Sequence, residues 1–348
     1  MKPIIECVPN VSEGSNYRII EAIASEIRKT KGVKLLHVDS HKDANRSVFT
    51  FAGVPEAVVE AAFRLIQKSV ELIDMRYHKG LHPRMGAVDV CPLVPIQGIS
   101  MEETAELARK LGQRVGEELR IPVYLYETSA TSPLRKRLED VRKGEYEGLP
   151  KRIAEGFLPD YGKAEFNPKT GAVIVGARPI LVAYNVNLAT KSVSVANEIA
   201  SEIRESGRIL KENGIIQRDE NGKPIRVPGI CKAVKAIGWY LESYGRAQVS
   251  MNLTDIEITP VHVAFEEVCR VAEKHGTYVT GSELVGLAPL RVFRDAANFY
   301  KQFIGYANKT LTEEEIVNFA AASLGLDDMD ANFNPFERVL EYQLKELL

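Results

Sequence analysis

The sequence has few cysteines, and no two of them form a Cys-x-x-Cys pair. The four are Cys7, Cys91, Cys231 and Cys269. A chain of 348 residues is too large to depend on disulfides, so we expect reduced and mostly buried thiols. An apolar signal region after the first methionine is also lacking, as is any apolar run of the roughly 18–20 residues that cross a membrane. These absences predict a cytoplasmic protein without a membrane partner.

An excess of charge of one sign is lacking too. The formal net charge is −2, which gives no electrostatic reason to expect a nucleic-acid partner. No Gly-x-Gly-x-x-Gly follows the first predicted strand, so nothing indicates a nucleotide phosphate loop. Apolar residues, in contrast, make up 45% of the chain, which is enough to bury real cores. The length favours two domains of about 100–200 residues each.

The order of predicted elements occurs twice. The first half reads as strand 4–9, helix 16–30, strands 33–38 and 47–52, helix 55–73 and strand 87–95. The second half reads as strand 179–188, helix 192–206, strands 233–241 and 248–253, helix 260–274 and strand 277–287. The hexapeptide Ile-Ala-Ser-Glu-Ile-Arg occupies both 23–28 and 199–204, in the first helix of each half. Together these similarities indicate an internal duplication.

A βαββαβ unit is typical of the ferredoxin-like fold, in which the helices cover one face of an antiparallel sheet. Two such units can bury their remaining faces against each other. We therefore predict an α+β protein with two ferredoxin-like subdomains, 1–178 and 179–325, whose stacked sheets form an α-β-β-α sandwich. A helical tail, 326–348, follows. The seam between the sheets is a favourable place for a ligand.

Three segments lie outside the repeat. The first contains a helix at 104–119, a strand at 123–127 and a charged helical stretch at 135–154. The second, 207–227, is polar, carries Asn213-Gly214 and Asn221-Gly222 turns, and reads as a loop or β-hairpin excursion. The third begins after Leu290 and looks helical, with a capping box at Thr312 to Glu315.

Basic residues are concentrated between Arg76 and Pro92. Arg76, His78, Lys79, His82 and Arg84 fall within nine residues, among glycines and a proline that shape the backbone. The segment is either a solvated basic turn or a cleft that holds a histidine for proton transfer near neutral pH. The spacing of His78 and His82 resembles a zinc pair only on a helix, and this stretch is not helical, so we expect no metal.

Two further segments are candidates. Asp39 ends a predicted strand, where it could orient a histidine, hold a substrate ammonium or belong to an ordinary turn. A loop bounded by glycines precedes the apolar strand 172–175, and it is either a ligand-binding loop or a plain connector. Its residues are Gly162, Lys163, Ala164, Glu165, Phe166, Asn167, Pro168, Lys169, Thr170 and Gly171.

Several segments resemble those of the glutamate formiminotransferase (formimidoyltransferase) family, which in some relatives is fused to a cyclodeaminase. The matching stretches are Cys-Val-Pro-Asn-Val-Ser-Glu-Gly at 7–14, His-Val-Asp at 37–39, Asn-Arg-Ser-Val at 45–48, Gly-Leu-His-Pro-Arg-Met-Gly-Ala at 80–87, Pro-Val-Tyr-Leu-Tyr at 122–126, Gly-Glu-Tyr-Glu at 144–147, Ala-Ile-Gly-Trp-Tyr at 236–240 and Gln-Val-Ser at 248–250. The resemblance runs from about residue 4 to 345 and, taken together, is highly specific. Two departures stand out: Leu81 where the family has Glu, and a longer excursion at 207–227.

The resemblance implies a folate-dependent enzyme that moves a formimino group from N-formimino-L-glutamate to N5 of tetrahydrofolate in histidine degradation. It implies His82 as the catalytic residue, 162–171 as the folate-binding loop, and a homodimer. Asp39 is a possible orienting partner of His82, and Arg46, Arg84 and Lys163 are candidate hosts for substrate carboxylates. Tetrahydrofolate is a co-substrate, and a separate enzyme would carry out the cyclodeaminase step.

Two rival functions remain. Leu81 favours a glutamate formyltransferase or a 5-formyltetrahydrofolate cyclo-ligase-like activity on the same scaffold. A non-catalytic folate-binding protein is the other alternative.

Overall fold

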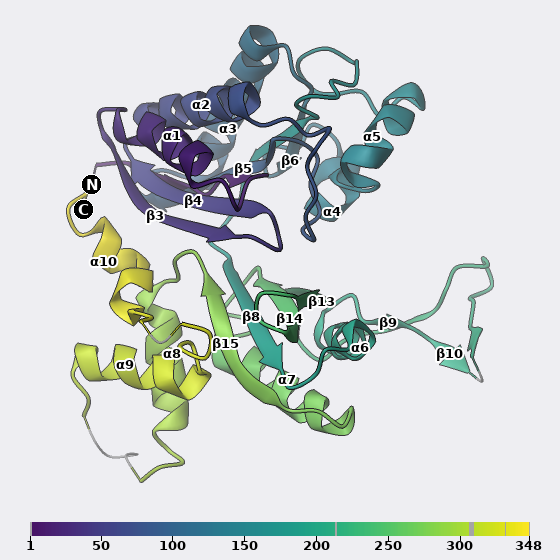
Figure 1. Ribbon diagram of the computed structural model, residues 1–348, viewed down its shortest axis with the longest axis vertical. Coiled ribbons are helices and arrows are strands. Elements are labelled where there is room, and N and C mark those ends of the chain that lie inside the picture. The colour runs from purple at the N-terminus through teal and green to yellow at the C-terminus, as the bar shows by residue number, and fades with distance from the viewer. Residues whose placement is uncertain (1, 213, 306–309, 331, 348) are drawn as a thin grey trace. The chain divides into compact units, whose positions relative to one another are not determined.

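The computed structural model describes residues 2–212, 214–305, 310–330 and 332–347. These residues form two compact units (Figure 1). The first unit comprises Met1–Ile180 with Leu344–Leu348, and the second comprises Leu181–Gln343. Each unit has its own buried apolar cluster, as the two-subdomain prediction requires. The predicted stacking of the two sheets against each other stays a prediction.

The first unit is built on one mixed sheet with the order β3-β4-β1/β2-β5-β7-β6. The strands are β1 (Ile4–Cys7), β2 (Asn10–Val11), β3 (Val33–His41), β4 (Arg46–Gly53), β5 (Val88–Gln97), β6 (Val123–Glu127) and β7 (Val173–Ala177). Because β1 and β2 both lie antiparallel between β4 and β5, they act as one interrupted strand. The β3-β4-β1/β2-β5 portion has the strand order of the predicted ferredoxin-like unit.

Three helices cover one face of this sheet: α1 (Tyr17–Arg28), α2 (Pro55–Leu72) and α3 (Met101–Arg114). Figure 1 shows α1 and α2 side by side over β3 and β4. The buried residues of α1 recur at helical spacing, and Ile23 and Ile27 among them are fully inaccessible. Side chains cap the N-termini of two of these helices. Asn16 accepts a hydrogen bond from an amide of α1, and Ser100 forms a capping box with Glu103 at the start of α3. A π-helical turn, η1 (Val115–Leu119), ends α3.

Two strands that the repeat did not account for extend the sheet. β7 pairs in parallel with β5, and β6 pairs in parallel with β7. Two short helices, α4 (Leu138–Val141) and α5 (Glu145–Ala154), cover the opposite face there, after a 3-10 turn at η2 (Pro133–Arg135). Their side chains form a separate apolar cluster with Tyr124 and Tyr126. The helix-free face of the first unit is therefore already partly covered within the unit, which the repeat alone did not predict.

The second unit repeats the ferredoxin-like order. Its sheet runs β13-β14-β8-β15, all antiparallel. The elements are β8 (Val182–Leu188), α6 (Val193–Ile203), β13 (Val234–Leu241), β14 (Arg246–Leu253), α7 (Val261–Lys274) and β15 (Val279–Val285). Buried residues of the two helices pack with Tyr184, Val186 and Val249 of the sheet. The duplicated topology is therefore confirmed in each unit separately.

The segment 207–227 forms β-ribbons, as one of the two readings predicted. β9 (Arg208–Ile209) pairs with β12 (Arg226–Val227), and β10 (Lys211–Glu212) pairs with β11 (Ile215–Ile216). Figure 1 shows this excursion extending away from α6. Asn213, in one of the predicted turns, lies outside the described residues.

The described residues after Leu290 are mostly helical, as predicted. It contains α8 (Leu290–Tyr300), α9 (Glu313–Leu324), η3 (Pro335–Arg338) and α10 (Leu340–Leu344). The capping box at Thr312 and Glu315 is confirmed. Across the described ranges, no helix combines the length and apolarity that a membrane crossing requires.

Candidate active site

His82 lies in an irregular segment that connects α2 to β5. The segment is fixed by backbone hydrogen bonds: the Leu81 amide donates to the Asp43 carbonyl (3.1 Å), and the Tyr146 amide donates to the Arg84 carbonyl (2.8 Å). Gly80 lies so close to the Ala44 carbonyl that a β-carbon would meet it at 2.4 Å. The glycine is thus required by packing, and the segment is held between the β3–β4 turn and the start of α5.

The His82 imidazole is half-buried, and its Nδ1 has two close neighbours. Arg46 Nη1 and the Pro83 carbonyl oxygen each lie 2.8 Å from it. Burial and the nearby guanidinium charges of Arg46 and Arg142 hold the pKa of His82 well below its usual 6.5, although Asp89 and the Pro83 carbonyl oppose the shift. His82 is therefore neutral at physiological pH.

A buried carboxylate, Asp89 on β5, organises the charges beside His82. Its side chain is fully inaccessible and bonds Arg46 Nη1 at 2.8 Å and Arg142 Nη2 at 2.6 Å. Burial alone would raise the pKa of Asp89, but the charges of Arg142 and Arg46 lower it below the usual value. The Asp89 carboxylate is therefore ionised, and His82, Arg46, Asp89 and Arg142 form one cluster, here called the His82 cluster.

Asn45 joins three parts of the site through one side chain and one carbonyl. Its Oδ1 accepts from the Gly14 amide (3.0 Å), its Nδ2 donates to the Lys79 carbonyl (2.8 Å), and its own carbonyl lies 3.1 Å from His78 Nε2. The residue has φ of 46°, in the left-handed region that asparagine tolerates better than most residues. Asn45 therefore holds the loop before α1 and the His82 segment at the turn that leads to Arg46.

We expect Asn45→Ala to destabilise the protein by about 1–3 kcal/mol, because it removes two hydrogen bonds and leaves alanine at positive φ. Asn45→Gly removes the same bonds but accepts that φ, so it should recover roughly 1 kcal/mol of the loss. Urea unfolding of the two variants beside the wild type measures the difference. An alanine variant as stable as the wild type would show that Asn45 does not brace the site.

The structure brings the loop 162–171 directly against the His82 segment. The Ala87 amide donates to the Thr170 carbonyl (2.8 Å), and the Ala172 amide donates to the Met85 carbonyl (3.0 Å). Gly86 and Gly171 face each other across this isolated bridge, where a β-carbon on either would meet backbone atoms below 2.5 Å. Two segments about 80 residues apart in sequence are thus joined three to five residues from His82.

Side chains reinforce the same junction. The Tyr146 hydroxyl donates to the Pro168 carbonyl (2.5 Å), and the Tyr146 ring lies 5.2 Å from the ring of Phe166. Within the loop, Lys163, Ala164 and Glu165 are exposed. The loop is therefore fixed at its C-terminal end and exposed over its N-terminal half, a form that suits ligand binding.

The two arginines predicted to host carboxylates already contact protein groups. Arg84 Nη2 lies 2.5 Å from Glu147 Oε1, and Arg84 Nε donates to His78 Nδ1 (3.3 Å). Arg46 is buried, and besides Asp89 and His82 it binds Asn10 Oδ1 through Nε (2.8 Å). Both arginines are part of the site, and their binding of a substrate carboxylate stays a prediction.

Asp39 lies on β3, opposite Val48 of β4. Its Oδ2 is 3.8 Å from His37 Nε2. The carboxylate that is linked to His82, by a shared contact with Arg46, belongs to Asp89 on β5. The orienting role of Asp39 stays a prediction.

Sequence reasoning did not identify Asp89 or Arg142. One signal was available for the first: Asp89 interrupts the apolar run Val88–Leu93, and a buried carboxylate requires charged or hydrogen-bonding partners. No comparable signal marked Arg142, which is one of several arginines in a charged stretch. Only the fold places it over β5.

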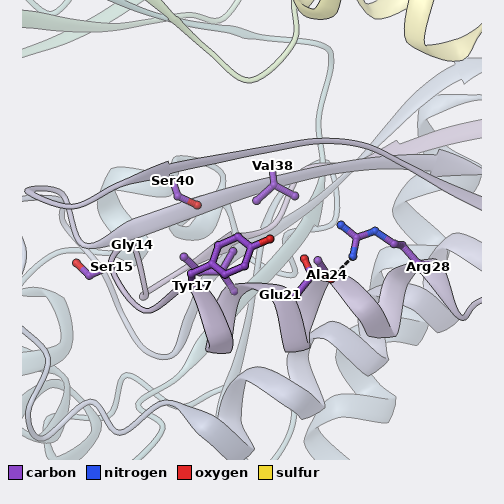
Figure 2. A pocket seen from close by; sticks show the side chains of 9 residues that line it. Gly14, Ser15, Tyr17, Glu21, Ala24, Arg28, Val38 and Ser40 are labelled. Atoms are coloured by element: carbon purple, nitrogen blue, oxygen red, sulfur yellow. Dashed lines mark hydrogen bonds and ion pairs between the residues drawn. The ribbon is translucent and has the colours of Figure 1, made fainter. Parts of the chain in front are cut away.

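A cavity of about 440 Å³ lies in the first unit between the start of α1 and β3. Figure 2 shows Tyr17, Val38 and Ser40 around it, with Glu21 and Arg28 paired at one end. Gly14 links it to the His82 cluster, because a β-carbon there would lie 2.5 Å from the Arg46 amide nitrogen. Within the described part of the chain, no group of three or more His, Cys, Asp and Glu side chains is arranged to hold a metal ion.

Comparison with known families matches nearly the whole chain. Residues 4–178 match the formiminotransferase domain, N-terminal subdomain, and residues 183–345 match the formiminotransferase domain. A solved microcompartment protein from Desulfitobacterium hafniense covers 81% of this chain and 93% of its own at 11% identity, but its TM-score of 0.20 supports no structural argument.

Curated relatives agree with these matches. A formimidoyltransferase-cyclodeaminase from Gallus gallus is 48% identical over 98% of this chain. The chain spans 60% of the length of that relative. A glutamate formimidoyltransferase from Streptococcus pyogenes serotype M1 is 42% identical over 87% of this chain and 94% of its own length. A glutamate formimidoyltransferase from Thermoplasma acidophilum is 39% identical over 90% of this chain and 97% of its own.

Proposed function

Because this chain belongs to the formiminotransferase family, we propose that it is a glutamate formimidoyltransferase. It moves a formimino group from N-formimino-L-glutamate to N5 of tetrahydrofolate, a step of histidine degradation and one-carbon metabolism. Tetrahydrofolate is a co-substrate. We also propose, from the family resemblance, that the protein acts in the cytoplasm as a homodimer.

His82 is the proton shuttle of this reaction. N5 attacks the amidine carbon and forms the new C–N bond, while His82 takes the N5 proton. The tetrahedral intermediate then breaks its bond to the glutamate nitrogen, and His82 returns the proton to that leaving nitrogen. A positioned imidazole of this kind contributes roughly 10²–10⁴-fold to the rate.

One observation carries this assignment: His82 is neutral and its Nδ1 is held by neighbours. Arg46 Nη1 and the Pro83 carbonyl oxygen both lie 2.8 Å from Nδ1. In the tautomer that leaves the Nε2 lone pair free, Nδ1 carries the proton and donates to the Pro83 carbonyl oxygen, and Arg46 is a neighbouring charge. The lowered pKa keeps the imidazole in the form that can accept a proton. Proton exchange with substrate then falls to Nε2.

The loop 162–171 holds the folate beside His82. Its backbone is bonded to the segment that carries the histidine, so a ligand on its exposed half lies near the imidazole. Lys163, Arg46 and Arg84 are the hosts for substrate carboxylates; of the three, Lys163 is the exposed one, whereas Arg46 and Arg84 also bind Asp89 and Glu147. A cation there complements the anionic glutamate portions of both substrates.

A second candidate is transfer of a formyl group, from formylglutamate or in a 5-formyltetrahydrofolate cyclo-ligase-like reaction. The observation that favours it is Leu81, an apolar and half-exposed side chain next to His82, at a position where the resembling pattern has glutamate. A non-catalytic folate-binding protein is a third possibility, and a turnover assay separates it from the other two.

The deciding experiment assays formiminoglutamate and formylglutamate, each with tetrahydrofolate, on one preparation. We expect 5-formiminotetrahydrofolate to form at a kcat/KM at least tenfold above that of the formyl product. A preference for formylglutamate would transfer the assignment to the second candidate. Binding of tetrahydrofolate without turnover of either donor would establish the third.

A further inference from the structure

Asp89 occupies an unusual position for a carboxylate. It is the second residue of β5, its neighbours Val88 and Val90 are buried, and its own side chain is fully inaccessible. Removing a carboxylate from water costs several kcal/mol unless charged partners offset it. A buried carboxylate of this kind therefore needs charged or hydrogen-bonding partners.

The Asp89 carboxylate binds through both oxygens. Oδ2 accepts from Arg46 Nη1 (2.8 Å) and Arg142 Nη2 (2.6 Å), and Oδ1 accepts from Arg142 Nε (3.2 Å) and the Met85 amide (3.0 Å). The Arg142 contact is bidentate, which fixes its guanidinium plane. Three parts of the first unit are thus tied to one side chain: β4, the segment after α4, and the backbone just beyond His82.

The Arg46 nitrogen that binds Asp89 is the one that contacts His82. Nη1 lies 2.8 Å from Asp89 Oδ2 and 2.8 Å from His82 Nδ1. Without the carboxylate, the guanidinium would lose the contact that sets its position against the ring. Asp89 therefore sets the surroundings of His82 indirectly, through Arg46.

The same cluster sets the charge around the imidazole. The charged groups that face His82 include Arg46 from β4, Arg142 from the segment after α4, and Asp89 from β5, with the Pro83 carbonyl on its own segment. Two guanidiniums and one carboxylate leave one net positive charge. When His82 takes a proton, it becomes a third cation here, and Asp89 is the anion of the cluster that offsets it.

Resting on the function proposed above, we propose that Asp89 is a positioning residue for the proton shuttle. It fixes Arg46 against His82 Nδ1 and supplies the negative charge that makes a protonated His82 tolerable during turnover. Arg142 completes the arrangement by keeping Asp89 ionised in a buried site. Because the Asp89 side chain is fully inaccessible, it acts through Arg46 and not by contact with substrate.

The test compares Asp89→Asn with Arg142→Gln by following the imidazole ¹⁵N resonances of the substrate-free protein against pH. His82→Gln identifies the His82 signals by their loss. Removing the anion should lower the pKa of His82 further, and removing one cation should raise it. A control, Asp160→Asn, removes another buried carboxylate, one paired with Arg135 at 2.5 Å, and should leave the pKa of His82 unchanged.

Opposite shifts in the two variants support the proposal, because loss of packing alone would not reverse sign. Unchanged pKa values, shifts in one direction, or an equal shift in Asp160→Asn would overturn it. If Asp89→Asn does not fold, Arg142→Gln decides, since it keeps the Asp89–Arg46 contact. This titration needs no turnover, so it can fail while the transferase assay succeeds, or the reverse.

Kinetics provide a second readout. We expect Asp89→Asn to lower kcat by roughly 10–100-fold, as losses of orienting partners commonly do. KM for tetrahydrofolate should change by less than about threefold, because Asp89 does not touch substrate. A change confined to KM would contradict a role in positioning His82.

Discussion

Replacing His82 with alanine or glutamine is expected to lower kcat of formimino transfer by roughly 10²–10⁴-fold, the loss typical of a general acid–base residue. In the proposed mechanism, this one side chain both takes the N5 proton and returns it to the leaving nitrogen. Substrate binding should be nearly unchanged, because the loop 162–171 and its junction with Met85 and Ala87 remain. Steady-state assays with both substrates at saturation measure the effect.

Two controls make the result specific. His275→Gln changes a histidine in the second unit that pairs with Glu202 at 3.0 Å, and it should leave kcat unchanged. Added imidazole should partly restore turnover to His82→Ala and not to His82→Gln, because only alanine leaves space for a free imidazole. Near-native activity of His82→Ala would remove this residue from the mechanism.

The second large effect is expected at Gly86. A β-carbon there would lie 2.4 Å from the carbonyl oxygens of Thr170 and Ala172 and 2.8 Å from the Ala172 amide nitrogen, all backbone atoms. Gly86→Ala must therefore push the loop 162–171 away from the His82 segment. We expect a loss of stability of about 1–3 kcal/mol or more from overpacking.

The displacement also predicts a kinetic change. A shift of about 1 Å between bound folate and His82 is enough to reduce kcat/KM on the order of 10²-fold. Gly148→Ala is the matched control: it lies in α5 with open space around its would-be β-carbon, and alanine should stabilise the helix by up to about 1 kcal/mol. If Gly86→Ala kept the stability and kcat/KM of the wild type, the loop and the His82 segment would not act as one unit.

Local signals in the chain were sufficient for most of the secondary structure. Proline at the starts of α2 and α7, and apolar positions at helical spacing, placed α1, α2 and α7 to within a few residues. The repeated order of elements then implied the ferredoxin-like strand order found in both sheets. Helix starts and apolar spacing depend only on residues that are close along the chain, so a single sequence is enough to predict them.

The extension of the first sheet illustrates where such reasoning stops. The strand 123–127 was predicted with its observed bounds, yet its partner was not. β6 pairs with β7, about 50 residues further along the chain, and parallel strands joined by so long a connection carry no local pairing signal. The cover that α4 and α5 provide was missed for the same reason.

The site divides in the same way. By itself, the sequence determined that His82 lies in a shaped basic segment, and the resemblance assigned it a catalytic role. Only the tertiary structure decided which charges surround it, because Arg46, Asp89 and Arg142 come from three separate elements and meet through side-chain contacts. A buried carboxylate in an apolar strand signals that partners must exist, but the fold alone selects them, since charge pairing depends on distance in space and not along the chain.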